Sequence, residues 1–173
     1  MTEHNAPHAT RDQYRGCLLG GAVGDALGAP IEFWTLNDIR NRYGEAGLTE
    51  FLPAYGLIGA ITDDTQMTLF TAEGLLRGLV RRQLRGVSSL PGVVDRAYLR
   101  WLQTQGDRNL HAPSPLDDGS AEWLYHQNEL HNRRAPGNTC LSALKQKTGL
   151  GKGRTKRQQG LRGRDACGAG WSL

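Results

Sequence analysis

The feature that most constrains the fold is a long segment whose apolar residues recur with helical period. From about Asp64 to Leu84 these residues are spaced to lie on one face of an α-helix, and arginines gather toward the C-terminal end, where the helix dipole favours cations. The apolar face is formed by Met67, Phe70, Leu75, Leu76, Leu79 and Val80. The pattern predicts a helix here, with Asp63 as its N-cap and Gln66 completing a capping box.

Four further helices are expected. Thr10 and Gln13 have the spacing of a capping box and predict a helix from about Arg11 to Leu27 that ends at Ala29-Pro30. Ser88-Ser89 followed by Pro91 marks the start of another, which Gly106 ends. Its expected buried stripe is Val94, Ala97, Tyr98, Trp101 and Leu102. Two shorter helices are predicted at about 120–132 and from Asn138 or Thr139, as the cap, to Leu144. No segment shows the two-residue alternation of a strand, so the predicted fold class is all-α.

The first of these helices is unusually rich in glycine. Each of Gly16, Gly20, Gly21 and Gly24 costs about 1 kcal/mol in a helix interior. Such a helix is expected where another backbone must come very close, so contact between helices through small residues is the simplest interpretation of most of these glycines. The spacing matches neither the phosphate-binding loop of nucleotide hydrolases nor the dinucleotide-binding fingerprint.

Composition divides the chain into two parts. The 173 residues suit one domain, and no apolar run is long enough to span a membrane. From Lys145 onward there are eight Lys and Arg against one acid, Asp165, which leaves 13 basic and 16 acidic residues before that point. The body is therefore mildly acidic and the tail strongly basic. The three cysteines are odd in number and form no CxxC pair, so the expected compartment is the cytoplasm.

The residues Thr62-Asp63-Asp64-Thr65 are the first candidate site. One acid would be enough to cap the helix, but two adjacent carboxylates flanked by hydroxyls offer several hard oxygen donors within one turn, as Mg²⁺ or Mn²⁺ prefers. Two more acids are candidates: Asp25, on the glycine-rich helix, and Glu32, in the turn that follows it.

Two long stretches together resemble the ADP-ribosylglycohydrolase family, which includes the dinitrogenase reductase-activating glycohydrolase and crystallin J1-like proteins. They are RGCLLGGAVGDALGAPIEF, residues 15–33, and GAITDDTQMTLFTAEGLL, residues 59–76. Residues 134–141, RAPGNTCL, are similar to the family's next block. The resemblance extends over roughly residues 12–144.

The resemblance implies an all-α domain with two neighbouring divalent cations, usually Mg²⁺, in a cleft. Thr62, Asp63 and Asp64 would be metal ligands, Glu32 a general acid/base or substrate-orienting carboxylate, and Asp25 a catalytic residue acting through a ligand or a metal-bound water. The reaction it implies is hydrolysis of the glycosidic bond between ADP-ribose and a protein side chain, often arginine, or in a related ADP-ribosyl compound. An ADP-ribosylated protein or small ADP-ribosyl compound is the expected partner, with neither a membrane nor nucleic acid expected.

The chain departs from the family pattern after about residue 144. An Asp-x-Asp segment that would supply the other metal ligands is missing, as is a glycine-rich block of the form KGCGGVMRVAP. With suitable synonymous codons, residues 157–173 read one base later give GNKGCGGVMRVAPVGL. We therefore expect a C-terminally truncated domain: a disordered leader at 1–10, the N-terminal part of the family domain at 11–144, and at 145–173 a disordered basic tail translated out of frame.

Three functions stay open at this point. The chain is the N-terminal portion of a working hydrolase, inactive or impaired as it stands because the C-terminal metal ligands are missing. Alternatively, it is a fragment or relative without catalysis. In the third, it is a nucleic-acid-binding protein that uses its basic tail, whose binding would depend strongly on salt.

Overall fold

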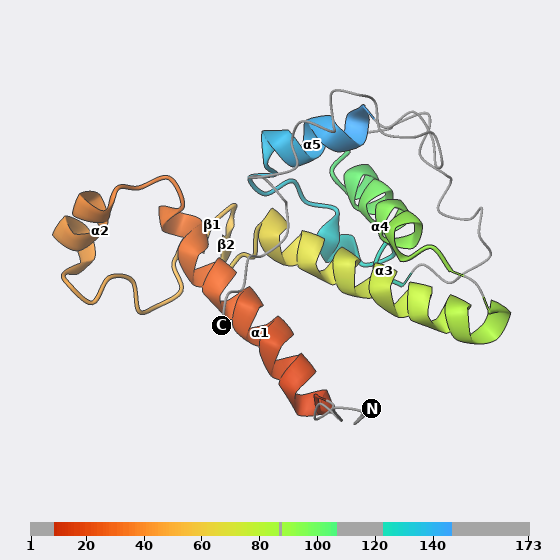
Figure 1. Ribbon diagram of the computed structural model, residues 1–173. Helices are drawn as coiled ribbons and strands as arrows, with labels where there is room; N and C mark the ends of the chain where they lie inside the picture. Colours follow the sequence, from red (N-terminus) through yellow and green to blue (C-terminus); the bar gives the residue numbers. More distant parts are fainter. Residues whose placement is uncertain (1–8, 87, 107–122, 147–173) are drawn as a thin grey trace. The chain divides into compact units, whose positions relative to one another are not determined.

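The computed structural model describes residues 9–86, 88–106 and 123–146, and the chain divides into two compact units, Met1–Leu69 and Phe70–Leu173. The described elements are almost all helical, which confirms the all-α prediction (Figure 1). Among them no helix is long and apolar enough to serve as a membrane span. The leader at 1–8, the loop from Asp107, the start of the helix expected at 120 and the tail from 147 lie outside the described residues.

The first unit begins with the glycine-rich helix α1, Arg11–Gly28. Its capping box is as predicted: the Gln13 amide donates to Thr10 Oγ1 at 3.3 Å, and the Thr10 amide donates to Gln13 Oε1 at 2.7 Å. A 3₁₀ turn, η1, continues the chain over Ala29–Ile31. Pro30 lies at the start of this turn, where its missing N–H is tolerated.

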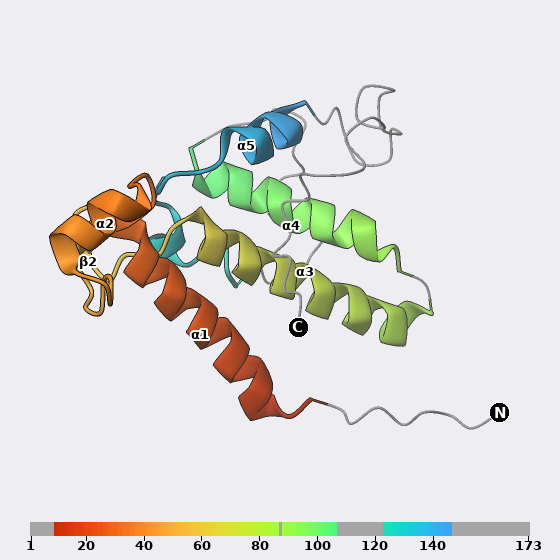
Figure 2. The ribbon, with the colours of Figure 1, turned by 60° about the vertical axis from the view of Figure 1, so that its left-hand side comes forward.

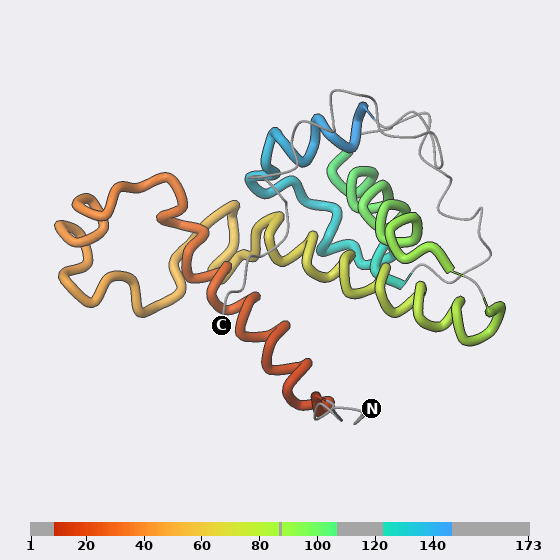
Figure 3. The backbone as a smooth tube through the Cα atoms, in the orientation of Figure 1, coloured from red at the N-terminus to blue at the C-terminus, as the bar shows by residue number. Residues whose placement is uncertain are grey.

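A short helix and a small hairpin complete this part of the first unit. Helix α2, Leu36–Tyr43, starts at a Thr35–Asp38 capping box and ends at Gly44. The strands β1, Pro53–Ala54, and β2, Leu57–Ile58, pair antiparallel, with Ala54 opposite Leu57. No strand was predicted, and that expectation is wrong here because a two-residue ladder is too short to produce a readable alternation. The continuous tube of Figure 3 follows this path from α1 to the hairpin.

Helix α3, Asp63–Arg85, crosses from the first unit into the second. Asp63 is its first residue rather than its cap. Thr62 precedes it, with Oγ1 accepting from the Asp64 amide at 3.3 Å and the carbonyl accepting from the Gln66 amide at 3.3 Å. The predicted cap is therefore one residue too late, because Thr62, a residue type that also caps helices well, takes that place.

The second unit packs α3 against α4, Leu90–Thr104, and α5, Asn138–Lys145, against α4 (Figures 1 and 2). Ser89 caps α4 as predicted, accepting from the Gly92 amide at 3.3 Å. Gly137 precedes α5, in place of the expected Asn138 or Thr139. Within 123–132 the structure has a turn and a 3₁₀ helix, η2, Asn128–Leu130, so the α-helix predicted at 120–132 is wrong over this part.

Large apolar side chains form the core of the second unit. Phe70, Ala97, Trp101 and Leu102 are completely buried. The predicted stripe of α4 is confirmed at Ala97, Trp101 and Leu102, whereas Val94 and Tyr98 are only partly buried. The other buried apolar residues of this unit are Val93, Leu99, Leu124, Leu130, Leu141 and Leu144.

Glycine permits a close helix contact, but not where the sequence predicted it. At Gly74, on α3, an added Cβ would lie 2.9 Å from the Val94 Cα, and at Gly78 it would meet the Leu90 side chain. On α1 the space around Gly16, Gly20, Gly21 and Gly24 holds no described atom within 4 Å of such a Cβ. Within the described part of the first unit the close approach predicted for α1 is not found, because helical spacing of glycines does not reveal whether a neighbour is present.

Candidate active site

Asp25, in the last turns of α1, forms the centre of the candidate site. Its Oδ1 accepts from Thr62 Oγ1 at 2.6 Å. Its Oδ2 accepts from the Thr62 amide at 2.8 Å, the Thr65 amide at 3.2 Å and Thr65 Oγ1 at 2.5 Å. Both carboxylate oxygens are therefore engaged with the two threonines that flank the predicted acid pair.

These bonds make Asp25 a remote cap for α3. The first amides of a helix lack partners within the helix and carry partial positive charge, which a carboxylate satisfies well. The Thr65 amide is one of them, and Asp64 donates to Thr62 instead. A residue 40 positions away in sequence thus fixes where α3 begins, and with it the orientation of Asp63 and Asp64.

The four residues of the turn differ in exposure. Thr62, Asp63 and Thr65 are buried, whereas Asp64 is exposed. A hydroxyl that donates its proton to a carboxylate keeps two lone pairs, and the Asp64 amide donates to one of those of Thr62. The hydrogen-bonding pattern therefore leaves a lone pair of Thr62 Oγ1 for a metal ion, beside the two acids.

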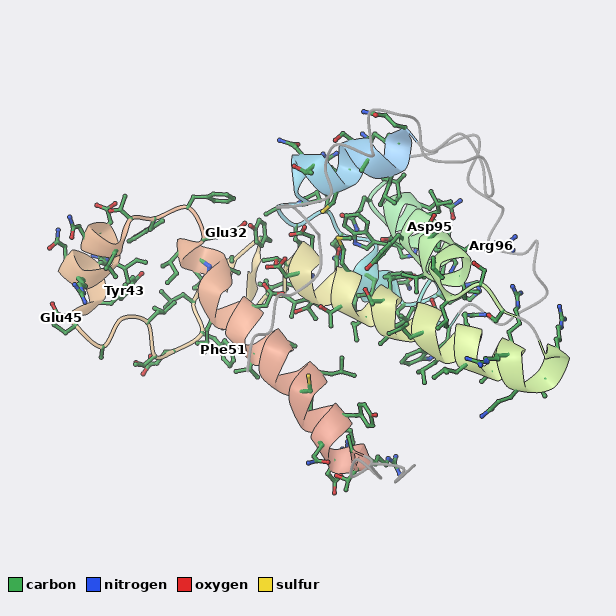
Figure 4. The ribbon with its side chains drawn as sticks, viewed as in Figure 1. Glu32, Tyr43, Glu45, Phe51, Asp95 and Arg96 are labelled. Carbon is green, nitrogen blue, oxygen red and sulfur yellow. The ribbon has the colours of Figure 1, made fainter. Side chains whose placement is uncertain are left out.

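Glu32 follows η1 and is reached by a side chain from the hairpin. The Tyr55 hydroxyl donates to Glu32 Oε2 at 3.4 Å, and β1 lies beside η1. Figure 4 labels Glu32 at this point of the first unit. Partial burial of the carboxyl group raises the pKa of Glu32, the hydrogen bond from Tyr55 lowers it, and the negative charges of Asp64 and Asp25 raise it further.

Tyr55 is a site residue that the sequence did not indicate. Partial burial raises its pKa, and the charge and hydrogen bond of Glu32 add to the effect, followed by the charges of Asp63 and Asp25. The hydroxyl therefore stays protonated and able to donate. The signal that could have found it is local: Tyr55-Gly56 occupies a two-residue turn between Leu52-Pro53-Ala54 and Leu57-Ile58, but without visible alternation the turn was not recognised.

The sequence-predicted residues therefore come together in the first unit. Asp25 contacts Thr62 directly, and the charges of Asp25 and Asp64 both act on Glu32. Such a constellation offers a carboxylate of raised pKa for proton transfer, next to an oxygen-rich helix start.

The donors suit Mg²⁺ in kind, and the described residues supply part of a shell. Magnesium is bound by oxygen in an octahedral arrangement, and Thr62, Asp63 and Asp64 offer oxygen within one turn. Across residues 9–86, 88–106 and 123–146 there is no group of three or more His, Cys, Asp or Glu side chains placed to hold a metal ion. A complete protein shell would need ligands from outside these residues, or water.

The chain is similar to two known proteins over part of its length. The chain is 46% identical over 68 residues to an uncharacterized protein of Archaeoglobus fulgidus, a match that covers 38% of this chain and 22% of that protein. It is 40% identical over 73 residues to the ADP-ribosyl-[dinitrogen reductase] glycohydrolase of Rhodospirillum rubrum, covering 39% of this chain and 23% of that enzyme. The chain thus matches less than a quarter of the length of either relative.

The match to a family model is much longer. The model of the ADP-ribosylglycohydrolase family matches residues 6–171, a range that passes the predicted domain end at 144. No solved structure matches the chain significantly. From the extent of the family match, the chain belongs to the ADP-ribosylglycohydrolase family.

Proposed function

We propose that this chain carries one part of the active site of a divalent-metal-dependent hydrolase that removes ADP-ribose from modified protein side chains or from a related ADP-ribosyl compound. The observation that supports it most is the Asp25 network, which fixes the threonines on either side of Asp63-Asp64 in a chain of this family. The name of the Rhodospirillum rubrum relative supports the substrate class.

Glu32 is the proposed general base. Its carboxylate accepts a proton from the attacking water as the water oxygen bonds to the anomeric carbon of the ribose. The bond from that carbon to the side-chain nitrogen or oxygen breaks, its electron pair stays on the leaving atom, and the proton held by Glu32 is then available to that atom. The raised pKa of Glu32 makes its carboxylate a stronger base than that of an ordinary glutamate, which favours uptake of the proton from water.

Thr62, Asp63 and Asp64 are the proposed metal ligands, for Mg²⁺ or, with the same donors, Mn²⁺. When bound, the metal would supply positive charge that orients ribose hydroxyls and polarises water. Asp25 accepts a hydrogen bond from the Thr62 hydroxyl and holds this turn in place. Its proposed contribution to catalysis is therefore through Thr62 and Thr65.

Two neighbouring cations, as the resemblance implies, need more ligands than Thr62, Asp63 and Asp64, so we propose that the chain alone is inactive or strongly impaired. Further acidic ligands would come from sequence equivalent to the remainder of the longer relatives, of which this chain matches 22% and 23%. The predicted change of reading frame between about Leu144 and Arg157 would place these ligands in the DNA that follows, in another frame. Sequencing the DNA from the Leu144 codon and reading all frames checks this prediction directly.

The activity test is release of ADP-ribose from an ADP-ribosylated arginine substrate. It compares the chain alone with the chain mixed with the C-terminal segment of the Rhodospirillum rubrum relative, each with Mg²⁺ and with excess EDTA. We expect release only from the mixture with Mg²⁺. Glu32→Gln in the mixture is expected to slow turnover by about 10²–10⁴-fold.

Two controls sharpen this test. Asp63→Asn should abolish Mg²⁺-dependent release, whereas Asp12→Asn, in the exposed first turn of α1, should leave the rate within about twofold, since surface changes away from such a site have small effects. Equal release by the mixture in Mg²⁺ and in EDTA, or by the Asp63→Asn variant, would refute the proposed metal ligands.

A further inference from the structure

The hairpin turn that carries Tyr55 has an uncommon residue for its backbone shape. With Ala54 paired to Leu57, Tyr55 and Gly56 form a two-residue loop, with φ of 50° and 80°. Positive φ at both central residues is typical of a type I′ turn, for which Asn-Gly, Asp-Gly and Gly-Gly are preferred. Gly56 follows this preference, while the bulky Tyr55 does not and is strained there.

Packing does not account for this tyrosine. Tyr55 is 44% exposed, so packing of its ring offsets the strain only in part. Strained non-glycine residues cluster at functional sites, where a side chain must be delivered to one place. The one side-chain hydrogen bond that the structure gives the Tyr55 hydroxyl is to Glu32, 23 positions earlier.

The hydrogen bond between the Tyr55 hydroxyl and Glu32 is long. At 3.4 Å between the hydroxyl oxygen and Glu32 Oε2 it exceeds the usual ~2.7–2.8 Å for two oxygens, and a long bond of this kind is compatible with catalytic groups whose hydrogen bonds tighten when substrate binds. The hydroxyl acts as a donor, which favours the ionised form of Glu32 that can accept a proton.

We propose that the strained Ala54–Leu57 turn makes Tyr55 a positioning residue for Glu32, holding its carboxylate ionised and oriented as the base of the glycosidic hydrolysis. This inference rests on the proposed role of Glu32. It gives a function to the Ala54–Leu57 turn, which the roles of α1 and of Asp63-Asp64 do not explain.

The test is a titration of Glu32 in the whole chain, followed by NMR with ¹³C-labelled glutamate carboxyl groups. Tyr55→Phe keeps the ring and the turn but loses the hydroxyl, so the titration midpoint of Glu32 should move to higher pH. Tyr14→Phe removes a tyrosine hydroxyl from the exposed surface of α1 and should leave the midpoint where it is. A midpoint that stays or falls in Tyr55→Phe overturns the proposal.

A second measurement leaves Tyr55 intact, in case the phenylalanine variant does not fold. The ¹³Cζ resonance of Tyr55 in the unsubstituted chain should show an inflection at the Glu32 midpoint, and Glu32→Gln should remove it. An inflection that persists in Glu32→Gln contradicts the proposed coupling. Both measurements are made without substrate, so they stand or fall independently of whether ADP-ribose is released.

Discussion

Each of the two units is stabilised internally by a different kind of interaction. In the second unit, Phe70, Trp101 and Leu102 are completely buried and form an apolar core. In the described part of the first unit, the buried apolar residues are three alanines, Ala26, Ala29 and Ala60, while two buried polar residues, Thr62 and Thr65, donate to the Asp25 carboxylate. Burial of large side chains is the main favourable term in most folding, so the first unit relies more on hydrogen bonds to a charge.

The difference teaches that the candidate site and the main core are separate features of this fold. A site built on four bonds to one carboxylate is specific in geometry but sensitive to the loss of a single side chain. A core built from many apolar contacts tolerates polar changes at its surface. Substitutions in each unit can therefore break or sharpen the comparison, provided that each unit is observed separately.

The largest effect is expected from Trp101→Ala. Trp101 is completely buried on α4, and truncating such a side chain leaves a cavity that costs about 3–5 kcal/mol. The free energy of unfolding of the second unit should fall by that amount in urea titrations followed by ¹⁹F NMR of fluorotryptophan. Trp123 reports the second unit in Trp101→Ala, Trp101 reports it in Trp123→Ala, and Trp34 reports the first unit. Trp123→Ala is the matched control: Trp123 is 68% exposed, and a loss within about 0.5 kcal/mol is expected. Equal losses would contradict the assignment of the core.

The first unit should respond next most strongly, to Asp25→Ala. This change leaves the buried Thr62 and Thr65 without their acceptor, and each unsatisfied buried group costs about 1–3 kcal/mol. We expect the first unit to lose about 2–4 kcal/mol, read from the Trp34 signal. Asp12→Ala removes an exposed acid from the same helix, whose pair with Arg15 spans 4.0 Å, and should cost less than about 0.5 kcal/mol. If Asp25→Ala costs no more than Asp12→Ala, the network does not stabilise the unit.

Sequence patterns predicted the helices well because capping and apolar period are local. The Thr10 capping box, the Ser89 cap and the long apolar stripe each lie within one element, so no knowledge of the tertiary fold was needed. The α-helix predicted at 120–132 is wrong in its described part, where the chain forms a turn and the 3₁₀ helix η2 instead.

The site was predictable only as far as its residues lie in recognisable motifs. Asp25 and Glu32 were found from the glycine-rich stretch and its resemblance, but the bonds from Thr62 and Thr65 to Asp25 depend on how α1 meets the start of α3. Tyr55 was missed because its role depends on a left-handed backbone and on a partner 23 residues away, neither of which has a sequence period. Contacts of this kind require the fold.

Two glycine substitutions are expected to change the free energy of unfolding in opposite directions, one in each unit. Gly74→Ala places a Cβ 2.9 Å from the Val94 Cα, so backbone must shift, and overpacking of this kind costs about 1–3 kcal/mol. Gly20→Ala meets no described atom within 4 Å, so the greater helix propensity of alanine should stabilise the first unit by about 0.5–1 kcal/mol. The same urea titrations measure both. Effects of the same sign would mean that the two helices do not differ in the closeness of their neighbours.

The smallest expected effect is the pH dependence that Glu32 gives the first unit. Because its folded pKa lies above its ordinary value, the folded unit binds the proton more tightly than the unfolded chain does. The resulting stabilisation is complete below the unfolded pKa and disappears as the pH rises through the folded pKa. Glu32→Gln should remove this component, so the free energy of unfolding of the variant, read from Trp34, should fall less over that acidic interval. A fall as steep as in the unsubstituted chain would place the titrating group elsewhere.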